Sequence, residues 1–166
     1  MRQRLSLRPI TAGDEPFLQA VFRSTREAEL AQLPLDDAQK DAFCALQFAA
    51  QDRSYRGAHP HAEFMLVLQD DLPIGRLYLA PTDDALLVLD ISLLPPWRNR
   101  GLGTALLRDT IERATRHGLP TQLQVASTNR AQRLYVREGF EPLAGSAGSG
   151  VYLELRRPLR PAPDPA

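Results

Sequence analysis

The sequence lacks several features that mark specialised protein classes. It contains one cysteine, so no disulfide can form within the chain, and no apolar run approaches the roughly 20 residues that cross a bilayer. The first residues, MRQRLSLRPITAGDE, are partly basic but have no apolar core of a secretory signal. We therefore expect a cytoplasmic protein without membrane contact. Cys44, in the apolar run AFCAL, is expected to be a buried side chain rather than a reactive thiol.

The chain also lacks net charge. Twenty lysine and arginine residues balance twenty aspartate and glutamate residues, which leaves no positive excess for binding nucleic acid or an anionic membrane. Apolar residues make up 43% and charged residues 24% of the 166 positions, as in an ordinary globular protein. We expect one domain over residues 1–157, followed by a proline-rich tail at 158–166 that is predicted to be disordered.

Hydrophobic periodicity in the first half of the chain predicts helices followed by a hairpin. The predicted elements are a strand at residues 5–9, a helix that begins after Asp14, a second helix from Asp36 or Asp37 to about Gln51, an irregular segment RSYRGAHPHAE, and the strands EFMLVLQD and PIGRLYLA around a turn at Asp70–Asp71.

The second half predicts a buried strand and then alternating helices and strands. ALLVLDISLL is almost continuously apolar, which is typical of a strand buried on both faces. From Gly101 to His117 the sequence predicts a helix with one apolar stripe, and Gly118 is placed to end it. The remaining predicted elements are a strand TQLQVA, a helix within STNRAQRLYVREG, and a final strand pair from FEPLAG and VYLELR.

The segment WRNRGLGTALL carries the first candidate site. Gly101 and Gly103 open a helix after a buried strand, where unpaired backbone N–H groups and the helix dipole attract an anion. Arg98 and Arg100 add positive charge at the rim, so the segment predicts a pyrophosphate site. The alternative is a tight turn with solvated arginines. No Lys-Ser/Thr follows the second glycine and no third glycine is present, so neither a P-loop nor a dinucleotide fingerprint is indicated.

The second candidate site is QLQVASTNRAQRLYVREGF. Asn129 lies where a helix begins and can satisfy backbone or ligand groups there. Leu134 and Tyr135 follow on the helix, and Gly139 ends it. The alternative for Tyr135 is a core aromatic with its hydroxyl at the edge.

Together the two segments resemble the GNAT superfamily of N-acetyltransferases, and the resemblance covers residues 3–157. Arg98–Gly103 matches the family's Arg/Gln-x-x-Gly-x-Gly/Ala signature. The second segment matches the family's Asn-x-x-Ala-x-x-Leu-Tyr-x-x-x-Gly-Phe pattern, except that the alanine comes one place early, at Ala131. The resemblance implies an α/β fold with a mixed, mostly antiparallel sheet flanked by helices, whose fourth and fifth strands splay apart near Leu93 and Val125.

The resemblance further implies direct transfer of an acetyl group from acetyl-CoA, used as a co-substrate, to a primary amine, without a metal. Tyr135 matches the position that commonly protonates the departing CoA thiolate, and a phenol with a pKa near 10 suits that role. The residues implied in binding acetyl-CoA are Ile91, Leu93, Arg98, Asn99, Arg100, Gly101, Leu102, Gly103, Thr104, Asn129 and Tyr135.

The general base departs from the family pattern. Relatives often place it at positions that match Leu87, Leu89 or Gln124, and none of these is ionisable. Asp90 is the carboxylate within the apolar strand and is the candidate base, with a purely structural role as the alternative. Gln51 and Tyr55 lie in the segment that walls the acceptor site in this fold, and either substrate contact or helix-end packing fits them.

The expected acceptor is a small-molecule or peptide amine, and the sequence does not specify which one. One alternative is a non-catalytic acyl-CoA-binding module, and another is an acyltransferase that uses a longer acyl donor or a hydroxyl acceptor. Homodimers are common among similar proteins, whereas no nucleic-acid or membrane partner is expected.

Overall fold

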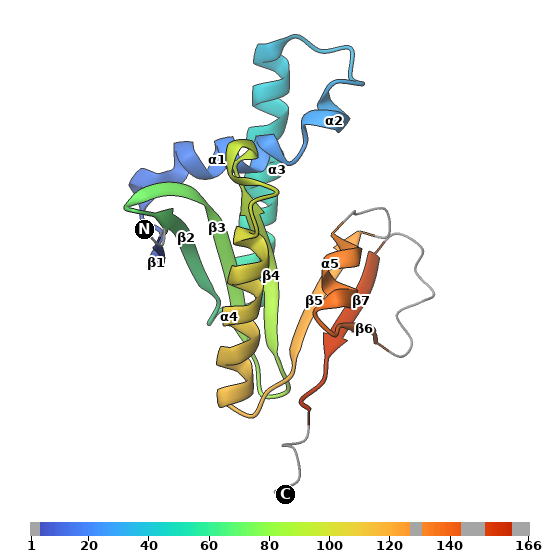
Figure 1. Cartoon of the computed structure of the whole chain (residues 1–166). Helices are drawn as coiled ribbons and strands as arrows, with labels where there is room; N and C mark the ends of the chain where they lie inside the picture. Colours follow the sequence, from blue (N-terminus) through green and yellow to red (C-terminus); the bar gives the residue numbers. More distant parts are fainter. Residues whose placement is uncertain (1–3, 127–130, 144–151, 161–166) are drawn as a thin grey trace, which may run out of the picture. The chain divides into compact units, whose positions relative to one another are not determined.

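The structure is a computed structural model, and it describes residues 4–126, 131–143 and 152–160. Its strands form a seven-stranded sheet in the order β1-β2-β3-β4-β5-β7-β6 (Figure 1). The sheet is mostly antiparallel, with β4 and β5 parallel. The predicted fold class is therefore confirmed. Most of the predicted disordered tail, residues 161–166, lies outside the described residues. No helix in the described ranges is long and apolar enough to cross a membrane.

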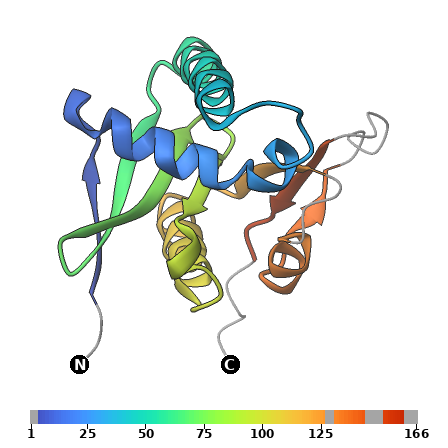
Figure 2. The same cartoon turned by 90° about the horizontal axis from the view of Figure 1, so that it is seen from above.

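The chain divides into two compact units, of which the first comprises Met1–Ala80 and Asp90–Gly103. Helices pack on its strands through a core of Leu18, Phe22, Phe48, Leu66 and Leu68, and α1 and α3 lie over the same face of these strands (Figure 2). The elements of this unit are β1 (Leu5–Pro9), α1 (Glu15–Ser24), α2 (Glu27–Leu30), α3 (Asp37–Ala58), β2 (Glu63–Gln69), β3 (Leu72–Pro81, to Ala80) and the end of β4 (Leu86–Leu93).

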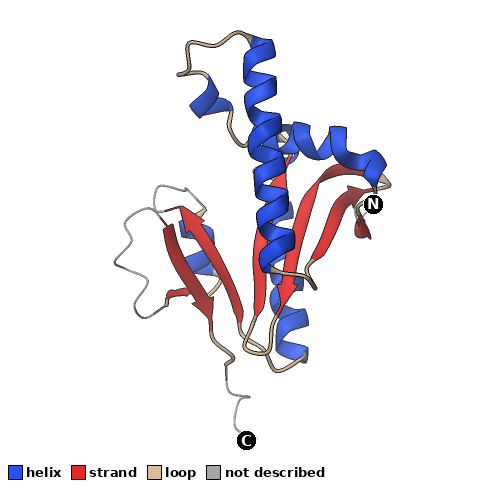
Figure 3. Ribbon diagram, turned by 180° about the vertical axis from the view of Figure 1, so that it is seen from behind, coloured by secondary structure: helices blue, strands red, loops and turns tan. Residues whose placement is uncertain are grey.

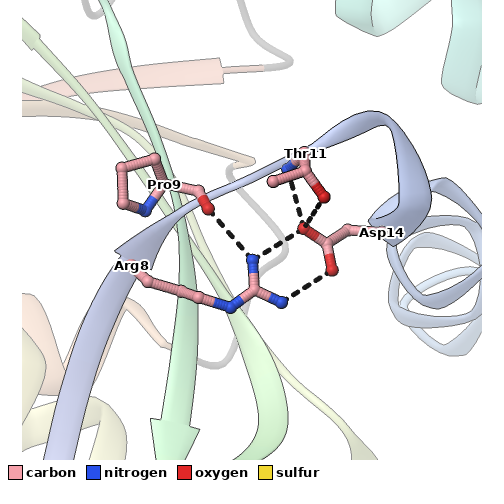
Figure 4. A network of polar contacts seen from close by, with 4 residues as sticks. All are labelled: Arg8, Pro9, Thr11 and Asp14. Atoms are coloured by element: carbon pink, nitrogen blue, oxygen red, sulfur yellow. Dashed lines mark hydrogen bonds and ion pairs between the residues drawn. The ribbon is translucent and has the colours of Figure 1, made fainter.

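A polar network near the surface joins the end of β1 to the start of α1 (Figure 4). The guanidinium of Arg8 donates two hydrogen bonds of 2.8 Å to the carboxylate of Asp14. The same carboxylate accepts from the backbone N–H and the hydroxyl of Thr11. These hydrogen bonds, that from Arg8 foremost, hold the pKa of Asp14 well below its usual range. Asp14 occupies the predicted N-cap position of α1, but its side chain accepts a hydrogen bond from the preceding turn and makes none to the helix.

The second helix begins as predicted and ends later. The carboxylate of Asp36 accepts from the N–H of Gln39, and the Gln39 side chain accepts from the N–H of Asp36, which forms a capping box. The prediction that the helix ends near Gln51 was wrong, because α3 continues to Ala58. The segment RSYRGAHPHAE was predicted to be irregular, but its residues up to Ala58 are helical, and Tyr55 packs edge-on against Tyr78 of the sheet. Figure 3 shows α3 lying along the strands of the first unit.

The predicted hairpin of β2 and β3 is confirmed. Gln69 pairs with Leu72, so the loop consists of Asp70 and Asp71 alone. Both have positive φ, 47° and 69°, which matches a type I′ turn, whose twist suits a two-residue hairpin.

The second unit comprises Pro81–Leu89 and Thr104–Ala166. In it α5 lies along one face of β5 and β7 (Figure 1), and β4 pairs with β5 from Leu86 to Val88. The apolar stripe predicted for the helix from Gly101 to His117 is buried, together with Thr110. The elements are most of α4 (Leu102–Arg116), β5 (Thr121–Ala126), α5 (Gln132–Arg137), β6 (Glu141–Pro142), β7 (Tyr152–Arg157) and the start of β4.

The prediction that β4 is buried on both faces was wrong. Leu86, Val88 and Leu93 are buried, but Leu87 and Leu89 are only half-buried. The strand therefore has one fully packed face along its first half. A nearly continuous apolar run cannot distinguish this pattern from burial on both faces.

Candidate functional site

The turn between β4 and α4 is open at its glycines. Pro95–Trp97 form a 3-10 helix, Asn99 and Gly101 have positive φ of 58° and 77°, and α4 begins at Leu102. A Cβ built on Gly101 or on Gly103 would meet no heavy atom of the described residues within 4 Å. Gly103 has no positive φ, so neither backbone conformation nor packing calls for a glycine there. The space in front of these two residues suits a ligand that approaches the backbone closely.

The two arginines of the turn both contact neighbouring groups of the protein. Arg98 donates from Nε to the carbonyl oxygen of Leu93 at 2.8 Å and from Nη2 to the hydroxyl of Ser24 at 2.9 Å. The guanidinium carbon of Arg100 lies 5.3 Å from the ring centroid of Trp97, a cation–π contact. Both arginines are exposed, and both make contacts beside the open turn.

A buried polar cluster lies between α3 and the strands β3 and β4, all in the first unit. At its centre Arg76, only 1% exposed, donates from Nη2 to the Asp90 carboxylate at 2.8 Å and to Gln51 Oε1 at 2.9 Å. We call Gln51, Tyr55, Arg76, Tyr78 and Asp90 the Arg76 cluster. Three predicted site residues, Gln51, Tyr55 and Asp90, are therefore brought together.

Sequence reasoning missed Arg76. A signal was present, because an arginine in the middle of the strand PIGRLYLA must be paired if it is buried. The partner, Asp90, is the ionisable residue within the next strand.

Two tyrosines complete the Arg76 cluster. The Tyr55 ring lies edge-on to the Tyr78 ring at 6.2 Å between centroids, and the guanidinium of Arg76 lies 4.8 Å from the Tyr78 ring centroid. Burial, and then the charge of Asp90, raise the pKa of Tyr55 to about 12. Burial also raises the pKa of Tyr78. Both phenols therefore stay protonated at neutral pH.

Both carboxylate oxygens of Asp90 are engaged. Oδ2 accepts from Arg76, and Oδ1 accepts a short hydrogen bond from the hydroxyl of Ser92. Its side chain is 14% exposed. A base must accept a proton from the substrate, and the contacts with Arg76 and Ser92 already occupy both oxygens. The contacts thus favour the structural alternative for Asp90.

Gly75 places the backbone of β3 against β4 beside the Arg76 cluster. A Cβ on Gly75 would collide with the carbonyl oxygen of Ser92 and lie 2.8 Å from the Leu93 side chain. The close approach of the two strands therefore requires glycine at this position.

The other predicted residues are placed separately. Tyr135 lies on α5, half-buried, with its ring 5.8 Å from and edge-on to that of Phe140. Ile91 is half-buried and Leu93 buried on β4. Leu102, Gly103 and Thr104 form the first turn of α4. Asn129 lies outside the described residues, which end at 126 and resume at 131.

Known proteins share both the sequence pattern and the fold of this chain. Residues 23–140 match the acetyltransferase (GNAT) family, whereas no curated protein matches the sequence. The fold is similar to that of the PaiA N-acetyltransferase from Thermoplasma acidophilum in complex with coenzyme A, with 15% identity over 93% of this chain and 99% of that chain and a TM-score of 0.68.

Two further solved structures share the fold. An acetyltransferase from Thermus thermophilus is 22% identical over 93% of this chain and 97% of that chain, with a TM-score of 0.66. The ribosomal-protein-S18-alanine N-acetyltransferase from Escherichia coli is 17% identical over 97% of both chains, with a TM-score of 0.63. These likenesses agree in fold, and the family match spans most of the sequence. The chain belongs to the GNAT acetyltransferase family.

Proposed function

We propose that this protein transfers an acetyl group from acetyl-CoA directly to a primary amine. The observation that carries the proposal is the open turn before α4, where neither packing nor backbone conformation accounts for Gly103. Residues Arg98–Thr104 would bind the pyrophosphate there, through the free N–H groups of the first helical turn. Main-chain groups of Ile91 and Leu93 would pair with the pantetheine arm, and Asn129 would contribute at the start of the second motif.

Acetyl-CoA would supply the acetyl group as a thioester. In the proposed reaction the neutral amine attacks the thioester carbonyl, the carbon–sulfur bond breaks, and Tyr135 gives its phenolic proton to the thiolate. The proton that the nitrogen loses as the amide forms returns to the Tyr135 oxygen, so that the products are the acetamide and the free CoA thiol. A phenol is an effective donor to a thiolate because it stays protonated at neutral pH. Proximity of amine and thioester supplies much of the acceleration, so no covalent enzyme intermediate is needed.

The ammonium form of the acceptor must first lose a proton. Asp90 is the candidate base that the sequence offers, but its ion pair with Arg76 favours the competing route, in which water takes the proton beside Tyr55 or Gln124. Gln51 and Tyr55 are proposed to contact the acceptor. They lie one turn apart on α3, so their side chains share one face of the helix.

Release of free CoA thiol from acetyl-CoA in the presence of a panel of amines tests the proposal. We expect turnover with at least one amine, and we expect Tyr135→Phe to lower kcat about 100-fold while leaving CoA affinity unchanged, as for loss of a general acid. Tyr152→Phe, an exposed tyrosine on β7, is the matched control.

Three outcomes would redirect the assignment. CoA binding without turnover of any acceptor would indicate a non-catalytic acyl-CoA-binding module. Turnover restricted to alcohols, or to longer acyl-CoA donors, would indicate an acyltransferase of another specificity. An unchanged kcat in Tyr135→Phe, with chemistry rate-limiting, would return Tyr135 to a packing role.

A further inference from the structure

The carboxylate and amide oxygens of the Arg76 cluster already accept hydrogen bonds within the protein. Both oxygens of Asp90 accept hydrogen bonds, from Arg76 and Ser92, and Oε1 of Gln51 accepts from Arg76. The hydrogen-bond donors of the same cluster are not consumed to the same extent. Within the described residues, the buried Nε of Arg76 and the buried hydroxyl of Tyr78 have no hydrogen-bond partner.

Arg76 also fixes the orientation of the Gln51 amide. A glutamine amide can present either its oxygen or its two N–H groups on a given side. Because Oε1 is held by the guanidinium, the Nε2 end is turned away from Arg76, and its N–H groups are the part of this half-buried side chain left to interact. The helix face over the cluster therefore offers the Gln51 N–H groups as donors.

We propose that the Arg76 cluster selects an acceptor amine that carries an oxygen acceptor, a carboxylate or a carbonyl, on the carbon next to its amino group. Gln51 is the specificity-determining donor to that oxygen, and Arg76 is a positioning residue that acts through Gln51. The inference rests on the proposed transfer to amines and names the substrate class for it. A simple alkylamine or polyamine has no group for these donors and would leave them unpaired, which is costly once water is excluded.

The geometry also predicts how Arg76 can be replaced. Both of its hydrogen bonds to the cluster leave from one atom, Nη2. A lysine ammonium presents three donors at a single nitrogen. Arg76→Lys can therefore keep both bonds and the charge, whereas Arg76→Met loses both bonds and the ion pair.

The first test compares matched amines: tyrosine and tyrosinamide against tyramine, and lysine against cadaverine, each by kcat/KM with acetyl-CoA saturating. We expect the carboxylate- or carbonyl-bearing member of each acetylated pair to be preferred by about 10-fold or more, the size of one hydrogen bond to a charged group. Gln51→Met should abolish that preference mainly through acceptor KM. Gln51→Glu, which turns the donor into an anion, should reverse it. Gln47→Met, one turn earlier on α3, should leave it unchanged.

The second test uses the positioning residue. Arg76→Lys should retain the preference, and Arg76→Met should lose it while CoA affinity stays the same. If Arg76→Met does not fold, the Gln51 variants and Arg76→Lys decide the matter. Loss of the preference in a folded Arg76→Lys would overturn the positioning role.

The failures are distinguishable. If the panel amines are acetylated without a preference for the carboxylate- or carbonyl-bearing member, the substrate class is wrong while the transferase function stands. The same holds if the Gln51→Met variant retains the wild-type preference. If CoA binds and no amine is acetylated, the proposed function fails and the inference falls with it.

Discussion

The Arg76 cluster and the turn before α4 differ in what surrounds their residues. In the cluster, side chains from a helix and two strands converge, and a buried charge is neutralised by a paired one. At the turn, by contrast, no atom of the described residues lies within 4 Å of a Cβ built on Gly101 or Gly103, so the backbone is accessible there. One region is built from contacts within the protein, and the other is the proposed contact surface for a ligand.

Glycine shows the difference most directly. Gly75, beside the cluster, is required because any side chain would collide with the neighbouring strand, whereas Gly103 has room for a side chain and positive φ is not needed. The same residue type is thus explained by packing in one place and by the proposed ligand in the other. Substitutions that separate stability from CoA binding can break or sharpen this comparison.

The largest expected effect is that of Asp90→Asn. The variant leaves the buried guanidinium of Arg76 without its counter-charge, which typically costs about 3–5 kcal/mol of unfolding free energy. Denaturant unfolding measures this loss. If Asp90 is structural, the pH profile of kcat/KM keeps its acidic limb in the folded fraction. Loss of that limb with unchanged stability would instead identify Asp90 as the base.

Gly75→Ala is expected to follow, with a loss of about 3 kcal/mol. The added methyl group meets backbone atoms, which cannot move aside as a flexible side chain can. Gly57→Ala on α3, where a Cβ meets nothing within 4 Å, is the matched control and should be neutral or slightly stabilising. Equal unfolding curves for Gly75→Ala and the wild type would mean that the strands do not approach this closely.

Gly103→Val should affect binding rather than folding. We expect CoA affinity, measured by calorimetry, to fall at least about 10-fold, because one blocked backbone contact with a charged group is worth roughly 1.5–3 kcal/mol. Gly103 is preferable to Gly101 for this test, since the positive φ of Gly101 would strain any side chain. Gly57→Val controls for the cost of valine in a helix. Normal CoA binding by Gly103→Val would remove the pyrophosphate site from this turn.

The smallest effect concerns the more exposed pair Arg8–Asp14, a contrast to the buried Arg76–Asp90 pair at the same distance of 2.8 Å. The pKa of Asp14 is lower in the folded state than in the unfolded chain, so its stabilisation is fully present above the ordinary carboxyl range and is lost progressively as pH falls from that range towards the lower folded-state pKa. The Tm difference between wild type and Asp14→Asn should therefore shrink below about pH 4 and in high salt. A Tm difference independent of both would assign the effect to the turn alone.

The sequence predicted most elements because their periodicity is local. The apolar stripe of α4 and the Asp70–Asp71 turn need only neighbouring residues to be recognised. Features that depend on tertiary contacts were not predicted. Helix α3 continues beyond Gln51, where Tyr55 packs on Tyr78, and the role of Arg76 depends on partners 14 and 25 positions away. Motif matching predicted the open glycines, but could not predict that Arg98 is already held by hydrogen bonds.

The placement of β1 has a consequence for the order of folding. The β2–β3 hairpin closes through a two-residue loop, and its formation needs no distant part of the chain. In contrast, β1 pairs only with β2 among the described strands, and the N–H of Arg4 meets Asp70 across 66 positions. Closing so long a loop has a high entropic cost until α1 and α3 have collapsed onto the hairpin. We therefore expect β1 to join late in folding, and its amide hydrogens to be the first in the first unit to exchange with solvent.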